Sequence, residues 1–110
     1  MLKKKYRLTS SFLFQKIFNQ GEFKENKFFV VIYTKNNLTH PRFGIVVSAK
    51  TFPLAVDRNS LKRKIRAILN NCVSLFKEGF DIVILTKKGV LDKPSQEIEE
   101  ALNELLVSLS

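Results

Sequence analysis

Residues 56–66 read VDRNSLKRKIR, and this stretch decides how the chain folds. At about 100° per residue, a helix through it places bases and one amide on one face and apolar residues on the neighbouring face. The polar face spans roughly 140° and consists of Arg58, Asn59, Lys62, Arg63 and Arg66. The apolar face consists of Leu61, Ile65, Ile68, Leu69, Cys72, Leu75 and Phe76. The sequence therefore predicts a long helix that packs one face in a core.

The polar face of this helix has two interpretations, a solvated surface or a binding surface. A solvated helical face usually mixes signs, because acid–base pairs four residues apart stabilise the helix. Here no acid occurs between residues 58 and 77. Guanidinium groups present planar forks of donors that match phosphate oxygens. We therefore predict an anionic partner, with nucleic acid as the first candidate.

The composition supports a folded basic domain. The 110 residues carry a net charge of +9, and 45% of them are hydrophobic, which excludes a disordered basic tail. Residues 1–90 hold 18 bases against 5 acids, whereas residues 91–110 hold 1 against 5. A chain of this length has room for one domain, expected over residues 1–110. No apolar run reaches the roughly 18 residues that span a bilayer, and no signal peptide is recognisable, so we expect a cytoplasmic protein without a membrane partner.

Hydrophobic periodicity predicts the other elements. We expect helices over about 11–20, from Pro53 to about 77, and from 94 or 95 onward. Gly21 is a suitable stop for the first of them. Runs of β-branched and aromatic residues predict strands over 28–34, 42–50 and 80–86.

The first predicted strand is apolar on both sides. Alternation places Phe28, Val30 and Ile32 on one side, and it places Phe29, Val31 and Tyr33 on the other. Because the chain offers few helices to cover a sheet, we expect a partly open apolar cleft on one face.

Phe14 and Phe18 lie four residues apart on the first helix and allow two interpretations. Their spacing alone favours a core stripe. Alternatively, Phe12, Leu13 and Ile17 fill the core, and the two rings are free to stack on unpaired bases.

Catalysis by the chain itself is not indicated. The central acids Asp57, Glu78 and Asp81 are too scattered for a metal-dependent nuclease site. His40 is the only histidine, and the lone Cys72 excludes a cysteine metal cluster. We predict no catalytic residue and no metal bound by the protein.

The segment from Arg58 to Arg66 resembles the Arg-Asn-x-x-Lys-Arg-x-x-Arg signature of the bacterial ribonuclease P protein subunit. Similar segments follow the order of that family over residues 7–107: Arg7-Leu8, Phe14 to Phe18 with Gly21, the strands 29–33 and 43–50, and Gly79-Phe80-Asp81-Ile82-Val83. The resemblance implies an α+β fold, an α/β sandwich of order αβββαβα that is similar to a ribosomal protein domain. Its four-stranded sheet contains a left-handed βαβ crossover, so a short fourth strand is expected within residues 22–27.

The resemblance also implies a function. Proteins of this family bind ribonuclease P RNA, and the resulting endoribonuclease removes the 5′ leader of precursor tRNA. The RNA holds Mg²⁺ and performs the hydrolysis, so we expect a complex of one protein with one RNA, and a protein that is inactive alone. The RNA-binding residues would be Arg58, Asn59, Lys62, Arg63 and Arg66, and the leader-binding cleft would contain Phe14, Phe18, Tyr33 and Lys50. Ser60 stands where the family often has Arg, so one phosphate contact is expected to be lost, and Ala49 stands where the family often has Lys.

Two other functions compete with this one. A ribosomal-protein-like RNA binder would need the basic helix but no leader cleft. A protein-only nuclease would need the clustered acids or histidine pair that the sequence lacks. For any of these, the excess of positive charge predicts a free protein that phosphate or RNA stabilises, because these bind only the folded form.

Overall fold

The computed structural model describes residues 2–110 and contains three α-helices and four strands. They are α1 (Ser11–Gln20), β1 (Glu22–Glu25), β2 (Phe29–Lys35), β3 (Arg42–Val46), α2 (Ala55–Cys72), β4 (Phe80–Thr86) and α3 (Ser95–Leu109). This is the predicted αβββαβα order, and β1 is the short strand expected within residues 22–27. Among the described residues, no helix is long and apolar enough to cross a membrane.

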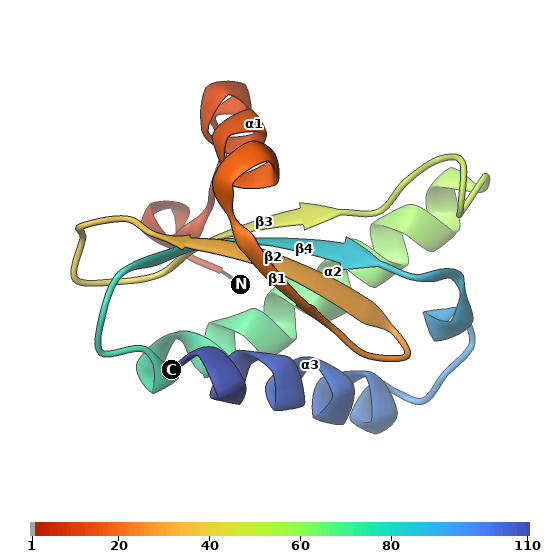
Figure 1. Ribbon diagram of the computed structural model, residues 1–110. Helices are drawn as coiled ribbons and strands as arrows, with labels where there is room; N and C mark the ends of the chain where they lie inside the picture. Colours follow the sequence, from red (N-terminus) through yellow and green to blue (C-terminus); the bar gives the residue numbers. More distant parts are fainter. Residues whose placement is uncertain (1) are drawn as a thin grey trace.

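The strands form one sheet in the order β1-β2-β4-β3. β2 is antiparallel to both of its neighbours, whereas β3 and β4 are parallel. Parallel neighbours need a connection that returns the chain to the starting end of the sheet, and α2 provides it. The crossover is left-handed (Figure 1), as the resemblance implied. It is an exception to the rule that such connections between parallel strands are right-handed.

The two faces of the sheet are covered unequally. Helices α2 and α3 lie side by side beneath one face, and α1 alone crosses the other (Figure 1). The larger core cluster lies under the first face and joins Phe29, Val31 and Ile84 to residues of α2 and α3 such as Ile65 and Leu102. A second cluster of Leu8, Ile17 and Val83 holds α1 on the opposite face. One face therefore has a closed core, and the other is only partly covered.

Element boundaries differ from the predictions where side chains and turns intervene. β3 ends at Val46 and not at residue 50, because a turn follows in which Phe52 N–H donates to the Ser48 carbonyl at 2.8 Å. Helix α2 begins at Ala55, two residues later than expected, and gives way to a 3-10 turn after Cys72. Leu75 lies in that turn and is exposed, so its prediction as a core residue is wrong.

Gly21 ends α1 for a steric reason. Its φ of −76° is open to any residue, so no left-handed conformation is required. A Cβ there would lie 2.6 Å from the Ile17 carbonyl oxygen and 2.8 Å from a methyl carbon of Ile32. The absent side chain lets the chain turn from α1 directly into β1 against the sheet.

Cys72 is buried between α2 and α3, as the apolar helical face predicted. Its thiol donates to Oδ1 of Asn103 at 2.9 Å. Burial, and after it the nearby charge of Glu99, raises the pKa of the Cys72 thiol to about 11. The thiol is therefore neutral at physiological pH and acts as a packing group.

A candidate nucleic-acid interface

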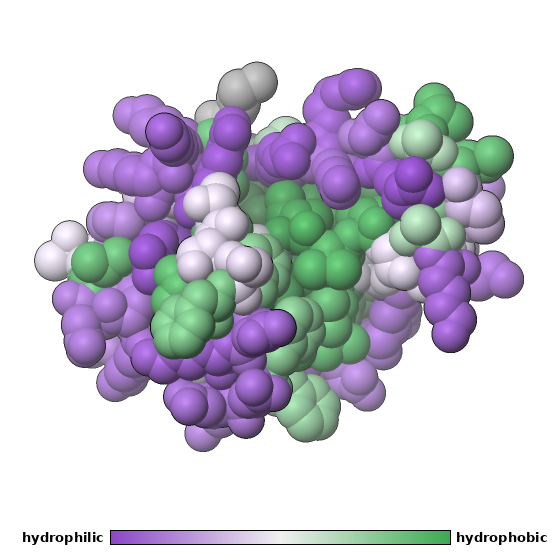
Figure 2. Space-filling model, turned by 90° about the horizontal axis from the view of Figure 1, so that it is seen from above, coloured by the Kyte–Doolittle hydropathy of each residue, from purple (hydrophilic) through white to green (hydrophobic). Residues whose placement is uncertain are grey.

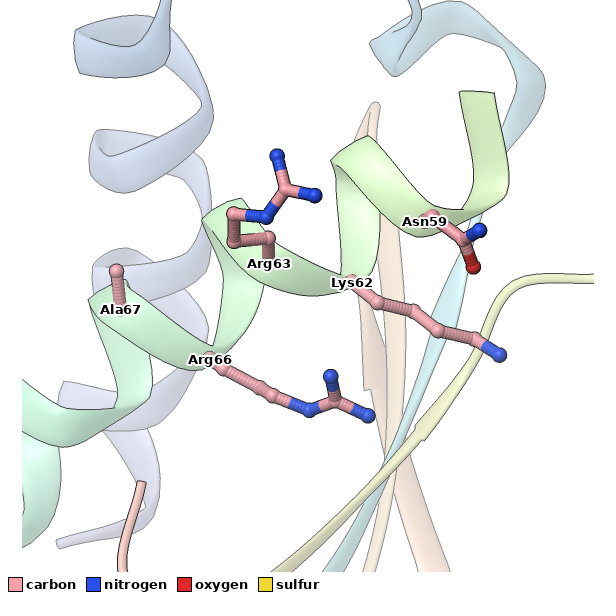
Figure 3. A pocket seen from close by; sticks show the side chains of 5 residues that line it. All are labelled: Asn59, Lys62, Arg63, Arg66 and Ala67. Atoms are coloured by element: carbon pink, nitrogen blue, oxygen red, sulfur yellow. The ribbon is translucent and has the colours of Figure 1, made fainter. Parts of the chain in front are cut away.

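Four of the five predicted RNA-binding residues lie together on α2. Asn59, Lys62, Arg63 and Arg66, with Ala67, line an open hollow on the surface of the helix. Asn59, Lys62 and Arg66 extend to the same side of α2, and Arg63 occupies the adjoining flank (Figure 3). The hollow thus combines three cationic side chains with one neutral amide, a donor set suited to phosphate oxygens.

Arg58 has a different environment from the other four. Its Nη1 donates to the backbone carbonyls of Phe52 and Pro53 at 2.8 and 2.9 Å. These bonds tie the loop before α2 to the first turn of the helix, whose N-cap residue Leu54 makes no side-chain cap. Arg58 does not line the hollow. Its first contribution is to hold the loop that leads into the basic helix.

The charge on this helix is uncompensated. Over residues 2–110, none of the ion pairs within 4 Å involves a base of α2. The only acid of the helix is Asp57, in its first turn, where a carboxylate is favoured by the helix dipole. An approaching polyanion would therefore meet bare guanidinium and ammonium groups.

The second surface is the part of the α1 side of the sheet that α1 does not cover. Val30, Leu85 and Val46 are register partners on adjacent strands, so they form a row across β2, β4 and β3. All three are half-buried, and we call this row with Ile32 and the Phe14 ring the open face. Figure 2 shows it as an apolar band between hydrophilic margins. This face is therefore apolar and only partly covered, while the cleft expected on it stays a prediction.

The α1 aromatic residues divide between packing and exposure. Leu13 and Ile17 make core contacts, as the stacking interpretation required, whereas Phe12 is 72% exposed and its prediction as a core residue is wrong. Phe14 is half-buried with its ring directly over Gly44 of β3, and a Cβ on that glycine would collide with the ring. Phe18 is 46% exposed and is available to a ligand.

Tyr33 is not gathered with the α1 rings. Tyr33 pairs in register with Ile82 and packs on the α2–α3 side of the sheet, opposite to Phe14. Its hydroxyl donates to Oε2 of Glu22 at 3.2 Å. The pKa of Tyr33 is raised, mainly by partial burial and secondly by this hydrogen bond. Lys50 is exposed in the turn after β3. The structure therefore does not place the four predicted leader-binding residues in one cleft.

Sequence reasoning had the signal for this separation but missed other contributors. Alternation along the strand already set Tyr33 on the side of Val31, away from Ile32. The sequence alone does not single out Val46 and Leu85 of the open face, or Gly44, over which the Phe14 ring lies. They depend on which strands become neighbours, which strand patterns alone do not specify.

Within the part of the chain that the structure describes, no three His, Cys, Asp or Glu side chains gather as a set of ligands. Asp81, a buried acid of β4, accepts hydrogen bonds from Nε and Nη2 of Arg42 at 2.8 Å each.

Comparisons with known proteins agree with the geometry. The family model described as "Ribonuclease P" matches residues 2–110. The ribonuclease P protein component of Thermotoga petrophila is 40% identical over 107 residues, covering 97% of this chain and 89% of that protein. That of Mesoplasma florum is 34% identical, with 96% of both chains covered. The solved RNase P protein of Thermotoga maritima superposes with a TM-score of 0.86 at 33% identity, covering 94% of this chain and 97% of that one.

Proposed function

Because this chain belongs to the ribonuclease P protein family, whose name places it in tRNA processing, we propose that it is the protein subunit of a ribonucleoprotein that removes 5′ leaders from precursor tRNA. In this proposal α2 binds the ribonuclease P RNA, and the open face binds the unpaired leader. The observation that carries the proposal is the presence of two chemically different surfaces on one small domain. One is an uncompensated basic helix face, and the other is an apolar sheet face with an exposed aromatic ring.

The α2 surface suits a folded RNA. Asn59, Lys62, Arg63 and Arg66 offer cations and an amide on a rigid helix that is anchored by buried Leu61 and Ile65. Phosphate contacts of this kind supply sequence-independent affinity and release counterions. Arg58 supports the surface by holding the preceding loop.

The open face suits unpaired nucleotides. Sequence-independent binding of single strands commonly uses aromatic rings on which bases stack, for roughly 1–3 kcal/mol per base. Phe18 offers an accessible ring, and the half-buried Phe14 ring, which lies over Gly44, precedes it by one helical turn. Lys50 follows β3 in an exposed turn from which it can reach a phosphate.

The chemistry in this proposal belongs to the RNA. The RNA subunit holds Mg²⁺, which activates water and stabilises the leaving oxygen. The protein contributes positive charge between two polyanions and extra contacts to the leader. It contributes no catalytic side chain, and one protein associates with one RNA.

Reconstituted cleavage tests the proposal. A 5′-labelled precursor tRNA is incubated in modest Mg²⁺ with a bacterial ribonuclease P RNA, with and without this protein. The expected result is an inert protein that increases RNA-dependent cleavage at the mature 5′ end. An unchanged cleavage rate despite RNA binding would favour a ribosomal-protein-like role, and cleavage by the protein alone would favour a protein-only nuclease.

A matched pair of variants tests the leader surface. Phe18→Ala is expected to weaken holoenzyme binding of leader-bearing tRNA about fivefold or more, with mature tRNA unaffected. Phe12→Ala is the control, since it removes an exposed ring that lies about 120° from Phe18 around the same helix. Equal losses for the two variants, or equal losses on the two RNAs, would argue against leader recognition by the open face.

A further inference from the structure

The open face continues beyond α1 onto the edge strand β1, where a second exposed ring is found. We infer that Phe23 is a further stacking contact for unpaired RNA, at the far end of the surface that begins at Phe14. The inference rests on the proposed function and extends it, because it lengthens the segment of unpaired RNA that the protein holds.

Strand register places Phe23 on the correct face. Phe23 pairs with Ile32, Ile32 pairs with Val83, and Val83 pairs with Gly44. These four residues form one row across all four strands and share one side of the sheet. Since neighbouring strands lie about 4.8 Å apart, the row is about 14 Å long. The Phe14 ring covers its Gly44 end, and Phe23 is its other end.

A path between the two rings is available. Helix α1 covers the middle of the row, where Val83 is fully buried against the helix. Beside the helix, a second row of the open face runs from β3 to β2. It consists of the half-buried residues Val46, Leu85 and Val30. Phe23 is diagonal to Val30 across the β1–β2 pair, a separation that an aromatic side chain spans. An RNA strand that follows this second row reaches Phe23.

Phe23 has no evident structural role. It is 66% exposed and belongs to neither core cluster. A large apolar side chain on an edge strand favours unwanted association, and natural sheets usually place charged residues there. Phe18 and Phe23 are exposed rings on the partly covered side of this sheet. They resemble in kind the exposed aromatic residues with which other four-stranded sheets stack RNA bases.

The acids that flank Phe23 do not oppose a polyanion. Glu22 points to the opposite side of the sheet and accepts a hydrogen bond from Tyr33. Glu25 shares the side of Phe23, but Lys87 pairs with it at 3.6 Å. The carboxylates next to the ring are therefore turned away or neutralised, on a chain whose net charge is +9.

The test uses the reconstituted holoenzyme and a series of precursor tRNAs whose leaders lengthen one nucleotide at a time. For the unmodified protein, affinity is expected to rise in steps as the leader reaches each ring. Phe23→Ala is expected to remove the last step, lowering affinity for long leaders about fivefold or more. Short leaders and mature tRNA should bind as before, and Phe23→Tyr should keep the step. Val107→Ala is the control, an exposed apolar residue on α3.

The outcomes separate this inference from the proposal beneath it. If Phe18→Ala weakens leader binding and Phe23→Ala has no effect at any length, the inference fails and the proposed function stands. If neither variant affects leader binding, leader recognition by the open face, which is part of the proposed function, fails as well. If Phe23→Ala only converts a dimer of the free protein to a monomer in sedimentation experiments, the ring serves contact between copies and the inference is overturned. Photo-crosslinking from thiouridine at the distal leader positions to the peptide containing Phe23 would support it directly.

Discussion

Asp81 is a buried charged residue whose partners are all supplied by one turn and one strand. It is 4% exposed and accepts two bonds from Arg42 and one from Nδ2 of Asn36 at 2.9 Å. The bond to Asp81 raises the pKa of Arg42, even though desolvation opposes it, so the guanidinium stays charged at all working pH values. Asn36 also donates to the His40 carbonyl, so the network ties the β2–β3 turn to β4.

Asp81→Asn is expected to destabilise the fold by about 2 kcal/mol, because it leaves Arg42 without its counter-charge in a partly buried site. For a domain of this size, that corresponds to a lowering of Tm by roughly 10 °C in a thermal melt. Glu78→Gln is the matched control, since the pair of Glu78 with Lys35 is largely exposed on both sides. Equal Tm changes in the two variants would contradict the assigned importance of the buried pair.

Gly44 is the seat of the Phe14 ring, so a side chain there must displace the ring. Gly44→Ala is expected to cost about 1–3 kcal/mol, the range for overpacking, and to weaken binding of leader-bearing tRNA. In the background of Phe14→Ala the same substitution should have a much smaller effect, because the clashing ring is gone. Chemical denaturation of the four proteins of this double-mutant cycle measures the coupling, and strictly additive effects would show that the ring and the glycine are independent.

At the scale of the element, we expect position on α2 to matter more for RNA binding than charge alone. Arg63 lines the hollow, whereas its neighbour Lys64 is exposed outside it. Arg63→Ala is expected to weaken binding of ribonuclease P RNA and to reduce the slope of log affinity against log salt by about one. Lys64→Ala removes the same charge and should leave that slope nearly unchanged. Titrations over a range of KCl concentrations measure both slopes. Equal reductions would show that the two residues act through their charge alone and that the α2 hollow is not a specific contact site.

For the whole molecule, the decisive quantity is the excess of unpaired positive charge. Of the 19 Lys and Arg residues, all within the described part of the chain, only Lys27, Lys35, Arg42 and Lys87 are in ion pairs. The repulsion among the others opposes the compact state, and a bound anion relieves it. The acids of residues 91–110 lie on and before α3, on the side of the sheet opposite to α1.

Phosphate is therefore expected to raise the Tm of the free protein more than chloride at equal ionic strength, because it binds only the folded form. Phosphate also strengthens burial in general, so a variant provides the control. With Arg63→Ala and Arg66→Ala combined, the phosphate-specific part of the shift should shrink. An equal shift in the variant would assign the effect to the solvent and not to the α2 hollow.

The sequence by itself determined the basic face of α2, the family, and the type and order of the elements except β1, which only the family resemblance implied. Helical and strand periodicities are local properties, and the spacing of Arg58, Asn59, Lys62, Arg63 and Arg66 fixes their common arc on any helix. Even the separation of Tyr33 from Ile32 follows from alternation along a single strand. For the same reason, the strand over 80–86 was predicted to the residue.

Tertiary structure alone decided which strands are neighbours and which side chains remain uncovered. The insertion of β4 between β2 and β3 brings Val30, Leu85 and Val46 into one row, although they are far apart in sequence. The approach of α1 to β3 sets Phe14 on Gly44 and leaves Phe12 exposed, which spacing within the helix does not distinguish. Packing likewise decided that Arg58 donates to the backbone carbonyls of Phe52 and Pro53 and does not line the hollow. Such contacts are set by packing between distant segments, and the pattern within each segment carries no information about them.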